Sequence, residues 1–439
     1  MYTMDLDEND ALANFFKIRT ITAFISESIN YTDPELLSLQ VEPAAEFLQK
    51  LQSIYESKGY EVQTIRIATR ALQQNITSRK QALDMAIALE QCCVAHGLSF
   101  LSLGSTSPAN SRTFLSDKHF ISELVASLKF TSLTVAWQPE WDFYEAKRLA
   151  EEIFRIAELT DGDANFRFAV SFNCKPGIPF FPAAEAPPPS SRIDKNEIPP
   201  ISFAIGTENS GLLYEAFSKA AAAADMPRRD LADAHLFTKH VLNKALQPIE
   251  NEAKKIASSS ICSSEGRKVY YLGIDTSVAP CLEESTTITA AFEKLPLLEK
   301  FGDSGTLAIT ERVTQALQSV SVDRIGYCGL MLPVCEDRGL AKAAEEGRIS
   351  IQSLLQYSAV CGVGLDTVPV PGPGPNATTK EREVLVTKAA AVLLDVAALS
   401  QRLGGKQLSV RLLPVLGAIP GEKTSYTSPY LVDSGVMSL

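Results

Sequence analysis

Regular alternation between strand-like and helix-like segments is the feature that most restricts the fold of this chain. The run KIRTITAFI, from Lys17 to Ile25, is rich in β-branched residues and predicts a strand. The next segment, VEPAAEFLQKLQSIYESKG, has apolar residues at helical spacing and stops at Gly59. The same strand and helix unit then repeats up to Phe172. Such alternation predicts a parallel sheet with right-handed helical crossovers.

A Pro-rich stretch at residues 173–200 interrupts this alternation. Its sequence, NCKPGIPFFPAAEAPPPSSRIDKNEIPP, fits neither the helical nor the strand period, so we expect a long irregular insertion. Loops of this length inside a compact domain are commonly functional or disordered. We expect the apolar start, Cys174 to Pro182, to pack over the protein, and Pro187 to Pro200 to be exposed to solvent.

The alternation resumes after the insertion and brings the number of predicted strands to ten. The later strands are ISFAIG, KVYYLGI, IGYCGLML, LDTVPVPG and KQLSVRLLPV, with helical stretches between them. An open sheet of ten strands would be strongly twisted, whereas a larger closed barrel has no exposed edges. We therefore expect one α/β domain over residues 17–439, a large closed barrel of about ten strands surrounded by helices. Residues 1–16 would form an N-terminal arm.

The charge and hydropathy of the chain exclude several classes of partner. Of its 439 residues, 52 are acidic and 41 basic, which gives a formal charge of -11 and a surface that repels phosphate backbones. No run of about eighteen apolar residues is present, and the acidic start MYTMDLDEND is unlike a secretory signal. We therefore expect a cytoplasmic protein that binds neither nucleic acid nor membrane. A homodimer is expected only because barrel proteins of this size often associate.

Six motifs, spread in one order from residue 17 to residue 372, carry a family resemblance. They are KIRTIT, GYEVQTIRIA, FRFAVSFNCKPGIPFFPAA, GIDTSVAP, GLMLPVCEDRGLA and VGLDTVPVPG. With these motifs the chain resembles the DUF711 family, also called UPF0210, of uncharacterised proteins. The resemblance implies an α/β barrel like that of pyruvate formate-lyase, with about ten strands. It also implies a small ACT-type amino-acid-binding protein as a partner.

Two departures limit what the resemblance implies about chemistry. The family usually carries a GTHGTT-like stretch where this chain has FGDSGT, so the His is replaced near Asp303 and its role is in doubt here. The C-terminal region also lacks the RVxGY context of a glycyl radical, and GAIPGEKTSYTSPYLVDSG does not replace it. Since a fold alone carries no function, we do not expect glycyl-radical chemistry.

Four carboxylates at strand ends are the candidate catalytic residues. Asp275, followed by Ser277 in GIDTSVAP, ends one predicted strand, and Asp366 opens another in VGLDTVPVPG. Glu336 and Asp337 lie between the strand GLMLPV and a helix. The functional interpretation is general acid/base catalysis or ligand binding, since strand ends hold the active sites of many α/β proteins. The structural alternative is capping of a loop or helix, and which member of the adjacent pair is functional stays open.

The same four carboxylates raise the question of a metal. Together Asp275, Glu336, Asp337 and Asp366 would suit a hard cation such as Mg²⁺ or Ca²⁺, or else the amine of an amino-acid substrate. The four His residues all lie in predicted helices or at their ends, which argues against zinc and non-haem iron. The Gly-rich CGVGLD precedes no helix and is not a nucleotide-binding motif.

The remaining site candidates would bind the substrate. Arg19 and Arg66 alternate with apolar neighbours in the first two strands. Arg19 would bind a carboxylate if the barrel interior is polar at this level, and otherwise pairs with an acid of a neighbouring strand. The other candidates belong to the insertion or to the strand end after Asp275, and Phe180 with Phe181 would cover a pocket. They are Asn173, Cys174, Phe180, Phe181 and Ser277.

These observations favour an enzyme of the lyase or hydrolase class. It would act on a small polar, amino-acid-like substrate through carboxylate acid/base or metal-assisted chemistry. The rival is a regulatory protein that senses a metabolite in the same pocket. The two differ because an enzyme needs a carboxylate of shifted pKa beside a reacting bond, whereas a sensor needs only complementarity to its ligand.

Overall fold

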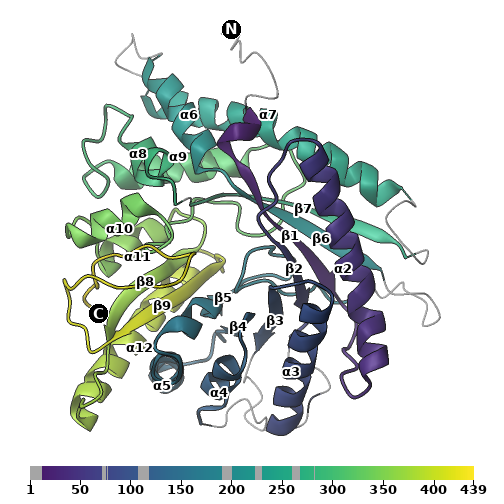
Figure 1. Ribbon diagram of the computed structural model, residues 1–439. Coiled ribbons are helices and arrows are strands. Elements are labelled where there is room, and N and C mark those ends of the chain that lie inside the picture. The colour runs from purple at the N-terminus through teal and green to yellow at the C-terminus, as the bar shows by residue number, and fades with distance from the viewer. Residues whose placement is uncertain are drawn as a thin grey trace.

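The computed structural model describes residues 12–71, 76, 78–106, 118–189, 200–222, 230–259, 267–280 and 282–439. Within these ranges, nine strands form one curved sheet flanked by helices (Figure 1). The strands are β1 (Lys17–Ile25), β2 (Ile65–Thr69), β3 (Leu101–Thr106), β4 (Thr131–Ala136), β5 (Phe168–Phe172), β6 (Ile201–Glu208), β7 (Val269–Ala279), β8 (Gly364–Gly372) and β9 (Leu408–Leu416). The predicted α/β class is therefore confirmed.

The order of the strands is β7-β6-β1-β2-β3-β4-β5-β9-β8. Strands β1 to β5 run parallel to one another, as the strand and helix alternation predicts. β6 pairs antiparallel with β1, and β9 pairs antiparallel with β5. β7 and β8 then extend the two ends of the sheet in parallel with β6 and β9. The second half of the chain therefore adds strands at both edges of the sheet that the first half builds.

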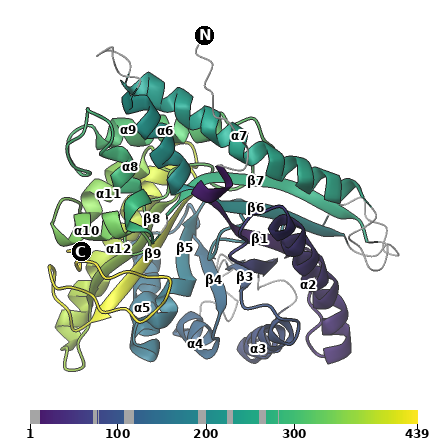
Figure 2. The ribbon, with the colours of Figure 1, turned by 45° about the horizontal axis from the view of Figure 1, so that its top comes forward.

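The longer helices lie along the outside of the curved sheet (Figure 2). Several helices begin at a polar residue whose side chain accepts hydrogen bonds from free backbone N–H groups of the first turn. Examples of such N-cap residues are Asp33, Ser78, Asp142 and Thr378. The helices are α2 (Pro34–Ser57), α3 (Arg79–Ala95), α4 (Phe120–Ser127), α5 (Phe143–Thr160), α6 (Ser210–Ala222), α7 (Asp230–Ser258), α8 (Ile288–Phe292), α9 (Thr306–Gln318), α10 (Arg338–Glu345), α11 (Ile351–Ser358) and α12 (Thr379–Arg402). Short 3-10 helices occur at Ala13–Phe15, Asp163–Arg167 and Glu284–Thr286.

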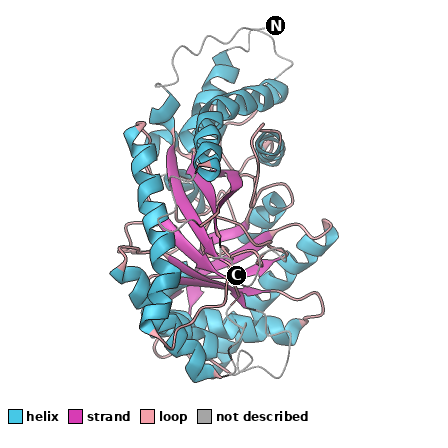
Figure 3. Ribbon diagram, turned by 90° about the vertical axis from the view of Figure 1, so that its right-hand side faces the viewer, coloured by secondary structure: helices cyan, strands magenta, loops and turns pink. Residues whose placement is uncertain are grey.

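The main hydrophobic core lies between the sheet and these helices. Outward-facing strand residues such as Ala23, Ile67 and Phe203 pack there against the apolar faces of the helices. Leu12 and Phe16, from the expected N-terminal arm, are also buried in this core. Among the described helices, none combines the length and apolar character needed to cross a membrane. Figure 3 shows helices on the flanks of the sheet and strands in the middle of the molecule.

The apolar part of the Pro-rich insertion packs on the inner face of the sheet, opposite the helices. The Thr22 hydroxyl of β1 donates a hydrogen bond to the Pro179 carbonyl (2.8 Å), and the Ser102 hydroxyl of β3 donates to the Ala184 carbonyl (2.6 Å). Phe180 lies against Gly206 of β6, where a Cβ atom would come within 2.6 Å of the ring. The expectation that the start of the insertion packs over the protein is therefore correct. Most of the stretch expected to be solvated, residues 190–199, lies outside the described residues.

The predicted strand at Ile325–Leu332 is wrong in detail. This segment lies between the two edge strands and forms β-bridges with them only at isolated positions: Ile274↔Arg324 and Val278↔Leu330 on β7, and Pro333↔Asp366 on β8. A regular strand is prevented by left-handed backbone at Gly326 (φ 90°) and Cys328 (φ 47°). Within the described residues, nine strands are therefore present where ten were expected, and an irregular segment lies between β7 and β8.

Candidate functional site

A cavity of about 1360 Å³ opens on the inner side of the sheet. Its wall combines β1, β2, β6, β8 and β9 with the insertion and with the C-terminal segment around Tyr430. Residues from both halves of the chain therefore meet at one place. The charged side chains of its lining include Arg19, Arg66, Glu208, Glu336, Asp366 and Arg411.

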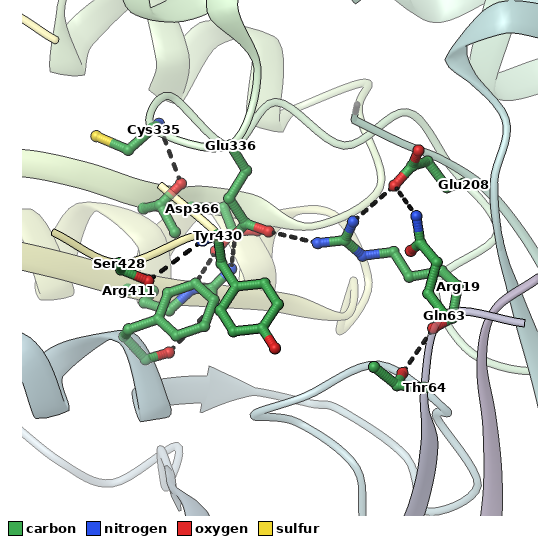
Figure 4. A network of polar contacts seen from close by, with 12 residues as sticks. Arg19, Gln63, Thr64, Glu208, Cys335, Glu336, Asp366, Arg411, Ser428 and Tyr430 are labelled. Carbon is green, nitrogen blue, oxygen red and sulfur yellow. Dashed lines mark hydrogen bonds and ion pairs between the residues drawn. The ribbon is translucent and has the colours of Figure 1, made fainter. Parts of the chain in front are cut away.

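Glu336 lies at the centre of this charged group (Figure 4). Its Oε1 accepts a hydrogen bond from Nη2 of Arg411 at 2.5 Å, and its Oε2 accepts one from Nη2 of Arg19 at 2.9 Å. The Glu336 side chain is only 7% exposed. Both carboxylate oxygens thus have a guanidinium partner, which fixes the position of the group.

Arg19 connects Glu336 with Glu208 of β6. Its Nη1 donates to Oε2 of Glu208 at 2.8 Å, and the same oxygen accepts a hydrogen bond from the Gln63 amide at 3.0 Å. Of the two roles expected for Arg19, the structure shows the pairing with an acid of a neighbouring strand. Arg19 therefore positions Glu336 and is already neutralised.

Arg411 connects Glu336 with Asp366. Its Nε donates to Oδ1 of Asp366 at 2.7 Å, its Nη1 donates to the Phe166 carbonyl at 3.1 Å, and its guanidinium lies 4.9 Å from the centre of the Phe166 ring. Burial alone would lower the pKa of Arg411, but the charges of Asp366 and Glu336 outweigh burial and raise it. Arg411 is a permanent cation that fixes two of the candidate carboxylates.

Arg66 of β2 lies in the same cavity but has no carboxylate partner among the residues that the structure describes. Its guanidinium lies over the rings of Phe100 and Phe181, at 4.8 Å and 4.9 Å from their centres. Its Nε donates to the Thr64 hydroxyl at 2.8 Å. Burial, followed by the charge of Arg19, lowers the pKa of Arg66 to about 9. The side chain is therefore charged at neutral pH and faces the cavity.

Asp275 lies outside the cavity lining and has a structural role. Its carboxylate accepts hydrogen bonds from the backbone N–H groups of Ser277, Tyr327 and Cys328 and from the Ser277 hydroxyl. Burial raises the pKa of Asp275, although these hydrogen bonds oppose the shift. The residue holds the irregular segment after Gly326 against β7, as the structural alternative proposed. Ser277, expected at the substrate, donates to Asp275 instead.

Asp337 is likewise occupied by the backbone. It caps α10 by accepting from the Leu340 N–H at 2.9 Å, and it accepts from the Ile288 N–H at 2.8 Å. Burial raises its pKa to about 6. Of the adjacent pair, Glu336 lines the cavity and Asp337 does not.

The candidates in the insertion are divided between the cavity and its surroundings. Phe180 and Phe181 line the cavity, as expected. Asn173 donates to the Ser400 hydroxyl at 2.8 Å and is not part of the lining. Cys174 contacts the Tyr327 hydroxyl at 3.4 Å and donates to the Leu408 carbonyl at 3.3 Å. Burial raises the pKa of Cys174 to about 11, so at neutral pH it is a thiol.

The four strand-end carboxylates do not converge on one point. Glu336 and Asp366 share Arg411, whereas Asp275 and Asp337 bind backbone N–H groups elsewhere. Among the residues that the structure describes, no group of three or more His, Cys, Asp or Glu side chains is arranged to hold a metal ion. The cavity instead carries alternating guanidinium and carboxylate groups.

Sequence reasoning missed three residues of this site: Glu208, Arg411 and Tyr430. Arg411 had a usable signal, because a lone charge inside the apolar strand LSVRLLPV is expensive unless it is paired. Glu208, at the end of its strand, resembles Asp275 in its setting and was overlooked. Tyr430 had no signal, since it belongs to an irregular segment and stacks on Phe166 only in the folded protein, at 6.0 Å between ring centres.

Comparison with known proteins places the chain among sequences without an assigned activity. The family model described as "Uncharacterised ACR (DUF711)" matches residues 12–427. A UPF0210 protein of Pyrobaculum arsenaticum is 27% identical over 401 residues, which cover 88% of this chain and 81% of the relative. A UPF0210 protein of Methanopyrus kandleri is 24% identical, and the match covers 96% of this chain and 92% of the relative. A bacterial relative, the UPF0210 protein of Leuconostoc mesenteroides, is 27% identical over 42% of this chain and 43% of its own length.

Proposed function

Because this chain belongs to the DUF711 family, whose members are described only as uncharacterised, we propose its function from the cavity itself. It is an enzyme of the lyase or hydrolase class that acts on a small polar, amino-acid-like substrate. The observation that carries this proposal is the position of Glu336, a buried carboxylate in the cavity wall held between two guanidinium groups. Fixed charges of this kind, pre-arranged in a site with little water, are what acid/base catalysis needs.

Glu336 and Tyr327 are the residues proposed for proton transfer. Glu336, held by its ion pairs with Arg19 and Arg411, acts as the general base. Burial, followed by the neighbouring Cys174, raises the pKa of the Tyr327 phenol, so this group stays protonated and donates a hydrogen bond to a substrate oxygen. Both side chains line the cavity. The Phe180 and Phe181 rings exclude water from the same space.

A metabolite-sensing protein is the second candidate, and one observation favours it. Both oxygens of Glu336 already accept hydrogen bonds from guanidinium groups, so neither oxygen is free to take a proton from a substrate. In a sensor the same cavity would recognise the ligand without breaking a bond.

The test combines ligand binding with turnover. Wild-type protein, Glu336→Gln and Glu299→Gln are incubated with a pool of amino acids and 2-hydroxy acids, followed by NMR for loss of any component and by thermal shift for binding. Glu299 is exposed and serves as the matched control. Consumption by wild type and Glu299→Gln but not by Glu336→Gln supports the enzyme. Thermal stabilisation of the protein by a compound that is not consumed supports the sensor. If no compound in the pool is consumed or stabilises the protein, both proposals are refuted.

Four further features belong to this proposal. The irregular segment at 323–334 completes a closed barrel, which the isolated bridges to both edge strands support. The protein is cytoplasmic, a proposal that its lack of long apolar runs supports. It forms a homodimer and binds an ACT-type regulatory protein, the latter through family resemblance alone. Light scattering of the purified protein, alone and mixed with such a protein, tests the last two points.

A further inference from the structure

Arg66 differs from the other cavity guanidinium groups, because no described residue gives it a carboxylate partner or a hydrogen-bond acceptor for its Nη atoms, whereas Arg167 donates to three backbone carbonyls. Arg19 and Arg411 each contact two carboxylates, whereas Arg66 has a single hydrogen bond, to the neutral Thr64 hydroxyl. No described residue accepts a hydrogen bond from its Nη atoms. The residue is nevertheless only 8% exposed. A buried cation without a counter-ion is costly, so its presence in the cavity wall needs an explanation.

The surroundings of Arg66 fix the orientation of its guanidinium group. The guanidinium lies over the rings of both Phe100 and Phe181, and the Nε hydrogen bond to Thr64 restricts the rotation of its plane. A guanidinium held in this way presents its two Nη atoms as a rigid fork. Such a fork matches the two oxygens of a carboxylate. Stacking also supplies part of the stabilisation that an ion pair would otherwise provide.

The other cavity charges indicate what accompanies that anion. The network around Glu336 joins two guanidinium groups, Arg19 and Arg411, to three carboxylates, Glu208, Glu336 and Asp366. One negative charge is therefore left over. Only Oδ1 of Asp366 has a hydrogen-bond donor among the described residues, so Oδ2 is available to a ligand. A doubly charged phosphate would be repelled by these carboxylates, whereas an ammonium group would be attracted.

We propose that Arg66 binds the carboxylate of a zwitterionic, amino-acid-class ligand, whose ammonium group lies beside Asp366. This inference rests on the proposed function, because it names the substrate class of the same cavity. It assigns the two charges of the ligand to two separate places in the wall. Arg66 and Asp366 both line the cavity, and each has polar atoms without a hydrogen-bond partner among the described residues.

The test uses fluorine NMR with trifluoroacetate as the carboxylate probe and monofluorophosphate as the phosphoryl probe, at constant ionic strength. We expect wild-type protein to broaden and shift the trifluoroacetate signal. Arg66→Met, which keeps the apolar stem beside the two rings, should weaken binding by roughly tenfold to hundredfold, as loss of hydrogen bonds to a charged group implies. Arg66→Lys should give an intermediate loss, because it keeps the charge and loses the fork. Arg402→Met, at an exposed site, is the control for surface binding.

Competition then tests the ammonium site. L-alanine should displace trifluoroacetate at lower concentration than acetate does, and Asp366→Asn should remove this advantage. Equal displacement by the two competitors would refute the zwitterion. Unchanged binding in both Arg66 variants, no binding by wild type, or a preference for monofluorophosphate would refute the carboxylate site.

The ligand site at Arg66 and the proposed enzyme activity can each fail without the other. Glu336→Gln should still bind trifluoroacetate even if it has lost turnover. Binding at Arg66 without turnover of any amino acid would support the ligand site and refute the enzyme activity. Turnover of an amino acid that is the same in wild type and Arg66→Met would support the enzyme and refute the role given to Arg66.

Discussion

Arg411 and Glu336, which lie 75 positions apart in the chain, form a buried ion pair with 2.5 Å between Nη2 and Oε1. Each side chain is 7% exposed. Arg411 belongs to β9, and Glu336 precedes α10, so the pair connects a strand of the sheet to the segment that lies between its edges. The contact therefore fixes the wall of the cavity as well as its charge.

Removal of the Arg411 charge should strongly destabilise the fold. In Arg411→Met, Glu336 keeps only Arg19 and Asp366 loses its ion-pair partner, so two buried carboxylates are undercompensated. We expect the free energy of unfolding to fall by about 3–5 kcal/mol. Urea denaturation followed by circular dichroism measures it. Lys342→Met, at an exposed ion pair, is the control and should change stability by less than about 0.5 kcal/mol. An equal effect of both substitutions would show that the buried network does not stabilise the fold.

Asp337 should give the protein a pH-dependent loss of stability. Burial raises its pKa in the folded protein from 3.8 to about 6, so between these values the folded state binds the proton more tightly than the unfolded state. Its contribution is fully present below about pH 4 and is lost as the pH rises through about 6, on the order of 3 kcal/mol in total.

The difference between wild type and Asp337→Asn isolates this contribution from all other titrating groups. We expect wild type to lose stability relative to the variant over that pH range, measured by urea denaturation at each pH. A difference that is constant with pH, or that changes in the opposite sense, would show that the backbone hydrogen bonds of Asp337 outweigh its burial.

The first half of the fold was predictable because its strands and helices repeat a local pattern. β1 begins and ends at the predicted residues, Lys17 and Ile25. Periodicity reports local structure, so it could not reveal that β6 and β9 run antiparallel to the strands beside them. Nor could it show that the stretch from Ile325 is irregular, because that depends on packing against β7.

The sequence predicted which types of residue form the candidate site better than it predicted which residues those side chains contact. Asp275 and Asp366 look alike in sequence, since both lie at strand ends beside Gly and Thr. Their roles differ because Asp275 meets the backbone of Tyr327 and Cys328, whereas Asp366 meets Arg411. These partners come from distant segments, and the sequence holds no local record of them. The same reason separates Glu336 from Asp337, which are adjacent but point to different places.

The packing of Gly326 on Asp275 should make this glycine hard to replace. Its φ is +90°, and a Cβ atom would lie 2.1 Å from Oδ2 of Asp275. Gly347 is the matched control, because its φ is +69° but no atom lies within 4 Å of its Cβ position. We expect Gly347→Ala to cost about 1–2 kcal/mol from backbone strain alone. Gly326→Ala should cost at least about 2 kcal/mol more, by chemical denaturation, since overpacking adds to the strain. Equal costs would mean that the segment yields easily and that Asp275 does not anchor it.

Cys174 should react slowly with alkylating reagents at neutral pH. Burial raises its pKa to about 11, although the hydrogen bond from Tyr327 opposes the shift. Against a usual thiol near pH 9, this predicts roughly hundredfold less thiolate at pH 7. The rate of iodoacetamide labelling, resolved by peptide mass spectrometry, should therefore rise about tenfold per pH unit up to about pH 11, because only the thiolate reacts.

Slow labelling could also result from poor access of the reagent to the buried thiol. The pH dependence of the labelling rate distinguishes poor access from protonation of the thiol. If opening of the protein limited the reaction, the labelling rate would level off well below that pH. Tyr327→Phe gives a second comparison: loss of its hydrogen bond should raise the pKa further and slow the labelling of Cys174. Rapid labelling at pH 7, with a plateau by pH 8, would show a stabilised thiolate. The proton-transfer roles given to Glu336 and Tyr327 would then have to be weighed against a nucleophilic cysteine beside Tyr327.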